Sequence, residues 1–365
     1  MVPISRRNLL ENKLRLAISA AGVALAIMLM LILNGFLAGM YHQITAYIDN
    51  TPADLYVAQK GVANMQGAGS IIPRSTVEKI EAVEGVKAAM PVFAQYAILD
   101  RHGKKVTTLL VGYEPDRGGG PWRLGAGRQV QSADEVVLDR VFARRYEMGI
   151  GDQIDILGRQ FRVVGLSEDT ASWMVSTLFL RHDAVTSLLQ SPGTTSFVLV
   201  ATDDPAATAE RIAAALPDVG VLPRETIAAN DIAYLGQAFS IPLRMMVLIS
   251  VGIGALLVGL TIYSATVERV REYGVLKAVG MGNGRLYGIV AQQALGATAL
   301  GFAVGLVLVR VVVGGIEYQW PQFLLIVDGN SIVQAAIGAV IMATVAAFLP
   351  ARYVGSIDPA QVFRR

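Results

Sequence analysis

The sequence predicts an α-helical membrane protein in which four transmembrane helices carry a large mixed α/β extracytoplasmic domain, inserted between the first and second helix. Only 16% of its 365 residues are charged and 53% are apolar, whereas soluble globular chains usually carry about 25% charged residues. A helix needs about 20 apolar residues to cross the hydrocarbon core of a bilayer, so long stretches without charge locate the spans. Four such stretches occur, at residues 16–48, 245–267, 286–309 and 329–351.

The first stretch predicts a permanent membrane anchor and not a cleaved signal peptide. Basic residues precede both kinds of segment, here Arg6, Arg7, Lys13 and Arg15. The apolar run that follows is about twice as long as the 7 to 15 residues usual in a signal peptide. We therefore expect a cytoplasmic segment at residues 1–16 and a first crossing at 17–40.

The distribution of Lys and Arg predicts the orientation in the membrane. Short cytoplasmic segments carry an excess of these residues, and they are frequent before the first span, between the second and third, and after the fourth. The short loop between the third and fourth spans has none. Both termini are therefore expected in the cytoplasm of a multi-pass protein of the inner or plasma membrane. The expected limits are 41–240 for the α/β domain, 243–267, 286–311 and 329–350 for the later spans, 268–285 for a cytoplasmic segment, 312–328 for an external loop and 351–365 for a cytoplasmic tail.

Short alternating segments predict mixed strands and helices in residues 41–240. β-branched and aromatic residues bounded by Gly, Pro and Asp favour strands, at 53–60, 105–115, 153–166 and 195–204. Helices are predicted at 75–86, capped by Ser75 or Thr76 with Glu78 and ended by Gly85, and within 204–221, with Pro205 near its first turn and Pro217 beyond its end. Each helix follows an extended segment, which indicates a duplicated strand-and-helix unit. The glycine-rich run 117–128 is expected to be a mobile surface loop.

The motifs of several enzyme classes are missing from the sequence. It contains no HExxH, no GxSxG and no GxxxxGK[ST], so we expect no catalytic residues and no ATP bound through a Walker A loop of this chain. The absence of cysteine excludes disulfides and thiolate metal ligands, and no metal site is predicted. The formal net charge of +2 and the lack of basic runs with interleaved aromatics argue against nucleic-acid binding.

Charged residues are absent from the four apolar stretches, which argues against an ion-coupled carrier. Two small-residue pairs lie within the spans, Gly35 with Gly39 and Gly301 with Gly305. This GxxxG spacing lets helix backbones approach closely. Packing inside one subunit and a dimer contact of the first span both remain open.

The charged segment 268–285 is predicted to contact a partner. Its first charges share one arc of a helix, but beyond Gly274 apolar residues occupy that same arc. One straight helix cannot keep both faces consistent, so we expect a break near Gly274 and a short second helix that ends at Gly280, Gly282 and Gly284. The resulting apolar patch on a short loop is typical of a partner surface.

Three segments resemble one family. "ERVREYGVLKAVGM" resembles the segment after the second span of the MacB/FtsX-like permeases of ABC transporters, through Glu268, Arg269, Arg271, Glu272, Gly274, Leu276, Lys277, Ala278 and Gly280. The tail is similar at Pro350, Ala351, Asp358, Pro359 and Arg364, and the start at Asn8, Leu9, Asn12, Lys13 and Arg15. Residues 127–166 are similar to the family's periplasmic core. We expect no fused ATPase domain, because the sequence looks closer to DevC-like and haem-exporter permeases.

The resemblance implies a permease subunit driven by a separate ATPase. Two ATPase copies would bind ATP and Mg beneath a homodimer of permeases, and closure of the ATPases would move the second span as a lever. The residues expected to couple the two proteins are Arg271, Glu272, Gly274, Val275, Leu276, Lys277, Val279 and Gly280. Leu276 and Val279 would be apolar anchors, and the charged members would orient the contact. A periplasmic adaptor is a further partner that the resemblance allows.

Three functions stay open within this resemblance. The first is export or extrusion of a hydrophobic or amphiphilic substrate. The second is mechanotransmission, in which the permease transports nothing and regulates an extracytoplasmic hydrolase. The third is haem export, with ligand taken from the outer leaflet and contacted by Met28, Met30, Tyr41 and His42. No cofactor of the chain's own is expected in any of them.

Overall fold

The computed structural model describes residues 13–67, 69–101, 103–172, 175–320 and 323–357. The chain divides into two compact units. We call residues 1–39, 240–320 and 324–365 the helical domain, and residues 40–239 with 321–323 the α/β domain. The division lies next to the limits expected from the sequence.

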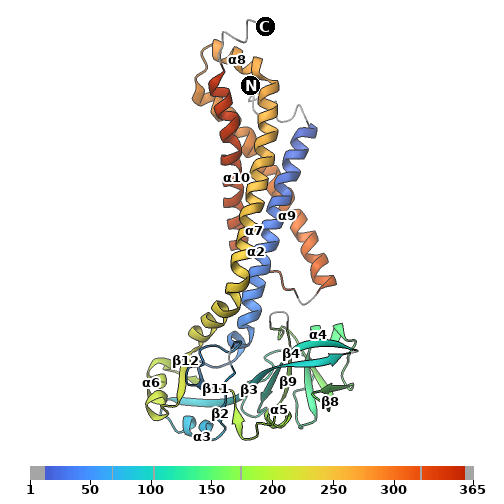
Figure 1. Cartoon of the computed structure of the whole chain (residues 1–365), viewed down its shortest axis with the longest axis vertical. Coiled ribbons are helices and arrows are strands. Elements are labelled where there is room, and N and C mark those ends of the chain that lie inside the picture. The colour runs from blue at the N-terminus through green and yellow to red at the C-terminus, as the bar shows by residue number, and fades with distance from the viewer. Residues whose placement is uncertain (1–12, 68, 102, 173–174, 321–322, 358–365) are drawn as a thin grey trace. The chain divides into compact units, whose positions relative to one another are not determined.

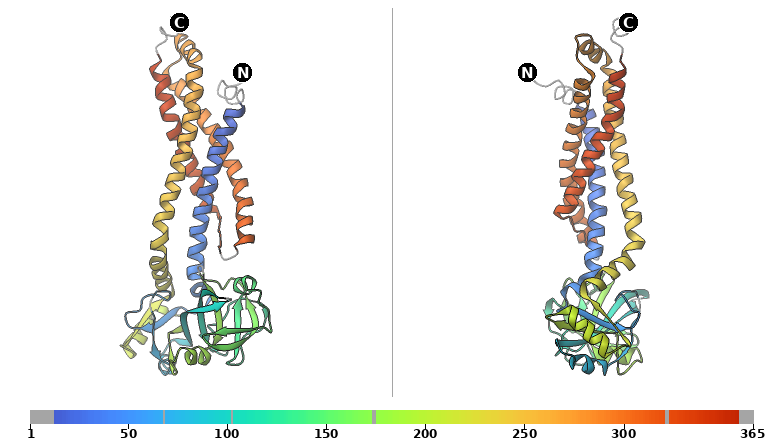
Figure 2. Two further views of the ribbon diagram at one scale, coloured as in Figure 1. Left: turned by 45° about the vertical axis from the view of Figure 1, so that its right-hand side comes forward. Right: turned by 90° about the vertical axis from the view of Figure 1, so that its left-hand side faces the viewer.

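Long helices build the helical domain. Among the described residues, four helices are long and apolar enough to cross a membrane: α2 (Lys13–Asn50), α7 (Arg224–Glu268), α9 (Asn283–Gln319) and α10 (Gly329–Ser356). They lie side by side in the views of Figures 1 and 2, and the short helix α8 (Val270–Ala278) lies at the end of the bundle where α2 begins and α10 ends. The helices of 38 and 45 residues, α2 and α7, are longer than a bilayer requires.

Glycines allow close packing around α2. A side chain on Gly301 or Gly305 of α9 would overlap the backbone and side chains of α2 at Ala20, Val23 and Ala24. This is the close helix approach that the GxxxG spacing permits. The second pair, in α2, faces a different element. Gly39 lies against the carbonyl of Leu324, and the Gly35 oxygen accepts a 3.0 Å hydrogen bond from the Ile326 nitrogen. Both pairs therefore make contacts inside one subunit.

The elements at the start and at the end of the α/β domain together form one β-α-β-β-α-β arrangement. Its elements are β1 (Leu55–Gln59), α3 (Thr76–Glu81), β3 (Val86–Arg101), β11 (Phe197–Thr202), α6 (Pro205–Ala215) and β12 (Val219–Pro223). The strands are antiparallel in the order β12-β1-β11-β3, as in a ferredoxin-like unit. Buried side chains from β1, β11, α3 and α6 form one core between sheet and helices. The duplicated strand-and-helix unit is thereby confirmed as β1-α3-β3 and β11-α6-β12.

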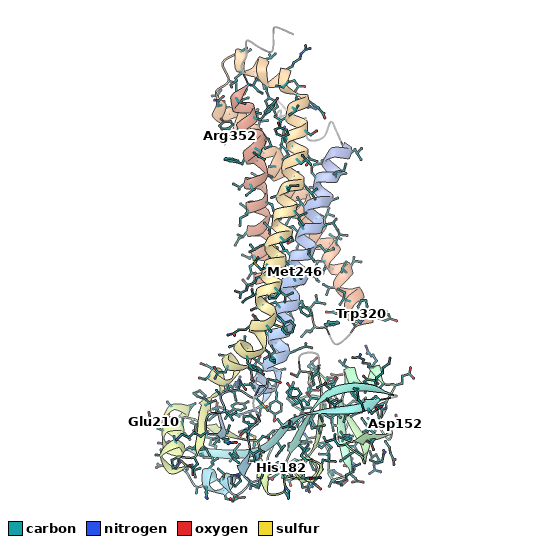
Figure 3. The ribbon with its side chains drawn as sticks, in the orientation of Figure 1. Asp152, His182, Glu210, Met246, Trp320 and Arg352 are labelled. Carbon is teal, nitrogen blue, oxygen red and sulfur yellow. The ribbon has the colours of Figure 1, made fainter. Side chains whose placement is uncertain are left out.

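A second lobe is inserted between β3 and β11. It contains β4 (Lys104–Tyr113), β5 (Leu124–Gly127), β6 (Glu135–Asp139), α4 (Arg140–Arg145), β7 (Gln153–Ile156), β8 (Arg159–Ser167), β9 (Ser176–Arg181) and α5 (His182–Leu188). The sheet continues as β3-β4-β9-β6-β8-β5, with β7 paired to β8. β3, with 16 residues, passes through both lobes. A separate two-stranded sheet joins β2 (Ile72–Pro73) to β10 (Thr194–Thr195). Figure 3 shows Glu210 and Asp152 in the two different lobes.

Several predicted limits were wrong for local reasons. The strand expected at 153–166 is a hairpin of β7 and β8, because Leu157 and Gly158 turn the chain with positive φ. The helix expected within 204–221 ends at Ala215, before Pro217 as predicted, and residues 219–223 form β12. The helix expected at 75–86 ends at Glu81, and the Ser75 side chain does not cap it.

The glycine-rich run 117–128 is packed against the domain core, so its assignment as a mobile loop was wrong. The Gly119 oxygen accepts a 2.6 Å hydrogen bond from the Tyr47 hydroxyl. Gly120 lies directly on the Tyr113 ring, where no side chain would fit. The last residues of the run form β5, which pairs with β8. The glycines thus serve close packing in this lobe.

Candidate functional site

The helix after the second span is interrupted earlier than the sequence indicated. α7 ends at Glu268, Arg269 has non-helical dihedral angles, and α8 starts at Val270. Gly274 lies buried inside α8. The predicted position of the break, near Gly274, was therefore wrong, because the break lies five residues earlier, at Arg269. Gly284, expected to end the short helix, lies in the first turn of α9.

The end of α8 is a Schellman motif that requires glycine. Gly280 has a φ of 95°, a left-handed conformation that only glycine adopts without strain. Its nitrogen donates to the Lys277 oxygen, and the Met281 nitrogen donates to the Leu276 oxygen, both at 3.0 Å. These are the two backbone bonds of the motif. Leu276 and Met281 both pack against the core of the helical domain, at the two positions that are commonly apolar in such caps.

α8 has one packed face and one exposed face. Tyr273 and Gly274 are buried, and Leu276 and Lys277 are half-buried. The exposed face, which we call the coupling face, recurs at helical spacing and consists of Arg271, Glu272, Val275, Ala278 and Val279. Val275 is 44% exposed and Val279 is 84% exposed. Of the two apolar anchors expected from the sequence, Val279 is accessible to a partner, whereas Leu276 contacts the chain's own core.

Lys277 has partners at the end of α10. Its Nζ donates hydrogen bonds to the backbone oxygens of Gly355 at 2.7 Å and Ile357 at 2.8 Å. The last carbonyls of a helix lack partners within the helix, and a positive charge near them is favourable. No basic residue of α10 lies in its own last turn. The ammonium therefore caps α10 from α8.

Tyr273 holds the packed face of α8 to α9. Its side chain is hydrogen-bonded to Gln293, and the ring belongs to the buried core of the helical domain. Burial raises the pKa of the Tyr273 hydroxyl, and the bond to Gln293 acts in the opposite direction. The hydroxyl is therefore neutral at physiological pH.

The residues considered for haem contact have ordinary packing partners. Met28 and Met30 pack in the core of the helical domain, and the Met30 sulfur faces Gly338 of α10. In the α/β domain, the Tyr41 ring lies against Gly236 of α7. His42 is exposed. In the part of the chain that the structure describes, no group of three His, Cys, Asp or Glu residues is arranged to hold a metal ion.

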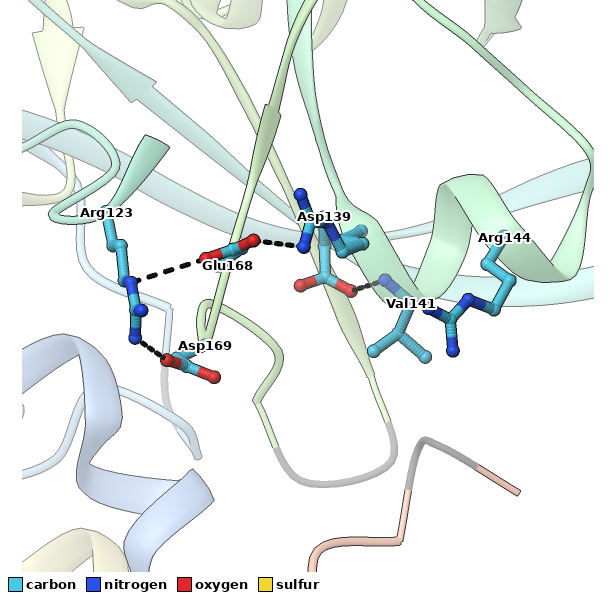
Figure 4. A pocket seen from close by; sticks show the side chains of 7 residues that line it. Arg123, Asp139, Val141, Arg144, Glu168 and Asp169 are labelled. Atoms are coloured by element: carbon cyan, nitrogen blue, oxygen red, sulfur yellow. Dashed lines mark hydrogen bonds and ion pairs between the residues drawn. The ribbon is translucent and has the colours of Figure 1, made fainter. Parts of the chain in front are cut away.

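A charged pocket of about 320 Å³ lies in the inserted lobe (Figure 4) and was missed by the sequence reasoning. It is lined by Arg123, Asp139, Arg140, Val141, Arg144, Glu168 and Asp169. Its charges largely satisfy one another. Arg123 pairs with Asp169 at 2.6 Å and with Glu168 at 3.3 Å, and Glu168 also pairs with Arg140. The acidic pair directly after β8 and the Arg-x-x-x-Arg spacing in α4 were the available signals.

The buried member of the pocket is Asp139, the N-cap of α4. Its Oδ1 accepts hydrogen bonds from the backbone nitrogens of Val141 and Phe142, and its Oδ2 accepts one from Thr170. Burial raises the pKa of the Asp139 carboxyl in spite of these bonds. Both oxygens of the Asp139 carboxyl therefore accept hydrogen bonds from groups within the lobe.

An apolar groove of about 700 Å³ lies between α7 and α10. It is lined by Gly252, Ala255, Leu256, Gly259, Leu260, Tyr263, Val345, Ala346 and Leu349. Gly259 allows α7 to approach the backbone of Ala346. No charged side chain lines this groove.

Comparison with known families assigns both domains. The MacB-like periplasmic core domain matches residues 16–218, and the FtsX-like permease C-terminal domain matches residues 244–359. The chain belongs to the MacB/FtsX-like ABC transporter permeases. The permease is 25% identical over 366 residues to an uncharacterized ABC transporter permease of Mycobacterium tuberculosis strain H37Rv, covering 98% of this chain and 97% of the relative. It is 24% identical over 365 residues to one of Mycobacterium bovis, with the same two coverages.

Two solved structures are similar to the α/β part of the permease. The periplasmic region of MacB from Actinobacillus actinomycetemcomitans aligns with a TM-score of 0.39 and 17% identity, over 51% of this chain and 96% of that one. The extracellular domain of the transporter YknZ from Gram-positive bacteria aligns with a TM-score of 0.38 and 13% identity, over 47% and 99%.

Proposed function

We propose that the permease is the membrane subunit of an ABC transporter in which a separate ATPase drives a conformational change of the α/β domain, and so the export of a hydrophobic or amphiphilic substrate. Two ATPase copies bind ATP and Mg beneath a homodimer of permeases. The observation that carries this proposal is the coupling face of α8. It presents Val275 and Val279 to solvent beside Arg271 and Glu272, which is the composition of a small protein contact with apolar anchors and orienting charges.

The proposed orientation places α8, the start of α2 and the end of α10 in the cytoplasm of an inner or plasma membrane protein. Basic residues are enriched at this end of the bundle, as the positive-inside rule requires. Figure 3 shows Arg352 near the α8 end of α10 and Trp320 at the other end of α9. Trp residues favour membrane interfaces. The α/β domain then lies outside the cytoplasm.

The route of coupling is supported by the length of α7. This helix is continuous from Arg224 to Glu268 and contains Pro242 without a break. Its 45 residues span about 68 Å at 1.5 Å per residue. One helix therefore begins within the α/β domain and ends one residue before α8. Coupling over such a distance needs a rigid transmitter between two states.

The test measures whether the ATPase still copurifies with the Val279→Asp permease. Val279 is exposed, so the substitution leaves the fold intact. In a contact with the ATPase, it would lose about 1.5 to 3 kcal/mol of apolar burial and add the desolvation of a charge. We expect affinity for the copurifying, Walker-type ATPase to fall tenfold or more. Leu276→Asp is a poorer test, because Leu276 packs against the helical core.

The matched control is Ile98→Asp. Ile98 is an apolar residue that is 62% exposed in β3 of the α/β domain, remote in sequence from the coupling face. It should leave ATPase binding unchanged. Normal copurification by Val279→Asp would contradict the proposed contact. Purified permease free of ATPase should not hydrolyse ATP, and turnover by it alone would contradict the division of labour. Reconstituted permease and ATPase that hydrolyse ATP but extrude no amphiphile would favour the regulatory function over export.

A further inference from the structure

α8 is not a simple extension of α7. The non-helical residue Arg269 separates the two helices, so the position of α8 also depends on contacts with helices other than α7. The contacts that hold α8 come from other helices. Tyr273 is bonded to Gln293 of α9, and Lys277 is bonded to the end of α10. These lateral contacts decide which helices move when α8 moves.

The contact between Lys277 and α10 is the most specific of them. One ammonium donates to two backbone oxygens, of Gly355 and Ile357, at 2.7 and 2.8 Å. Charge-assisted hydrogen bonds of this length are stronger than neutral ones. The side chain is half-buried, so water competes less for the ammonium than at an open surface.

The residues around Gly355 pack the end of α10 against further helices. A side chain on Gly355 would overlap the Tyr287 hydroxyl of α9. Two residues earlier in α10, the Tyr353 ring contacts the Tyr263 ring of α7 edge-on, with centroids 5.4 Å apart. The end of α10 therefore contacts α7, α8 and α9. A group that fixes α8 to this end connects α8 to all of them.

We propose that Lys277 is a positioning residue that joins the coupling helix α8 to the end of α10, so that the ATPase moves α10 together with α8. This inference rests on the proposed function and changes the role expected for Lys277, from a charge that faces the ATPase to one that faces the permease's own fourth span. The coupling face and the Lys277 contact lie on different sides of α8. Binding of the ATPase and transmission of its movement are therefore separable by mutation.

The experiment measures a distance between α8 and α10 in the full permease with its ATPase in nanodiscs. Because the chain has no cysteine, Gly282→Cys places one spin label in the turn directly after the cap of α8, and Arg352→Cys places the other on α10. Both positions are exposed. In the wild-type background, the distribution of spin-label distances should be narrow. It should be the same in the nucleotide-free and the ADP-vanadate-trapped states, since the two helices move as one body.

In Lys277→Gln, the distance should broaden or lengthen in the trapped state, while ATPase copurification stays within twofold of wild type. Lys277→Arg should restore the narrow distance, because a guanidinium also donates to the two carbonyls. Arg285→Gln is the matched control, an exposed basic residue two positions into α9, and should behave as wild type. A role in stability alone would not produce a change that depends on the trapped nucleotide and is rescued by arginine.

Two results overturn the inference, and they are distinguishable from failure of the proposed function. A wild-type distance in Lys277→Gln in both states would show that Lys277 does not join the helices. A change of the wild-type distance on trapping would show that α8 moves without α10. A wild-type permease that binds no ATPase would instead overturn the proposed function and this inference with it.

Discussion

Glu135 and Arg128 form a bidentate ion pair at the start of β6. The Arg128 Nη2 lies 2.6 Å from Glu135 Oε1, and the Nη1 lies 2.8 Å from Oε2. Arg162 and the backbone nitrogens of Gln131 and Ser132 also donate hydrogen bonds to the Glu135 carboxylate. Glu135 is only 2% exposed. The hydrogen bonds from Arg128 lower the pKa of this carboxyl from 4.5 to about 2.

The first prediction is that Glu135 stabilises the α/β domain in a pH-dependent way. The folded-state pKa lies below the unfolded value, so the stabilisation is complete above about pH 4.5 and disappears as the pH falls toward 2. Because Arg128 and Arg162 are partly exposed, solvent screens these ion pairs, and we expect Glu135 to contribute about 1 to 3 kcal/mol. Glu135→Gln should lower the free energy of unfolding by about that amount at pH 7, and the two proteins should converge in acid. Thermal unfolding in detergent across this pH range measures it.

The control for Glu135 is Asp100→Asn. The Asp100 carboxylate is 3.0 Å from Lys105 but is exposed, and exposed pairs contribute about 0 to 1 kcal/mol. Its removal should change stability little at any pH. Equal stability of wild type and Glu135→Gln at pH 7 would disprove the role of the buried pair.

The second prediction concerns the cap of α8. Gly280→Ala places a side chain in a left-handed conformation, at a cost of about 1 to 2 kcal/mol. The amides of residues 280 and 281 should therefore exchange with deuterium roughly tenfold faster. Gly282→Ala is the control, because Gly282 has a φ of −70° and open space around it. Unchanged exchange in Gly280→Ala would mean that the cap does not hold the end of α8.

The third prediction concerns the segment between α9 and α10 that packs on α2. A side chain on Gly39 would overlap the Leu324 oxygen, so Gly39→Ala should displace this segment and destabilise the permease by about 1 to 3 kcal/mol. Exchange of the Ile326 amide, which is bonded to the Gly35 oxygen, should accelerate. Gly314→Ala, in α9 with no neighbour within 4 Å, should be neutral or stabilising. The same thermal midpoint for Gly39→Ala and wild type would refute the contact.

The fourth prediction concerns topology, for which the cysteine-free chain is a clean background. Lys104→Cys, in the α/β domain, should react with a membrane-impermeant maleimide in intact spheroplasts. Gly282→Cys, after α8, should react only once the membrane is permeabilised. Both residues are exposed, so access and not burial decides the result. Labelling of both from outside would contradict the proposed orientation.

The sequence by itself determined the four spans, the domain inserted between the first two, and the location of the charged segment that contains α8. Long stretches without charge are sufficient for the spans, because an unpaired charge in lipid is costly whatever the rest of the chain does. The segment 268–285 was recognisable because its charges and glycines are local. Its family motif is contiguous, and so are the residues of α8 that form the Schellman motif.

Only the tertiary structure decided which side chains of α8 are accessible. Leu276 and Val279 are both apolar and three residues apart, yet one packs on the helical core and the other is 84% exposed. Lys277 reads as a partner-facing charge until the end of α10, 78 residues away, is placed beside it. The glycine pair of α2 faces a loop almost 300 residues later for the same reason. Local periodicity gives the faces of a helix, but which face is covered depends on elements that are distant in sequence and meet only in the folded protein.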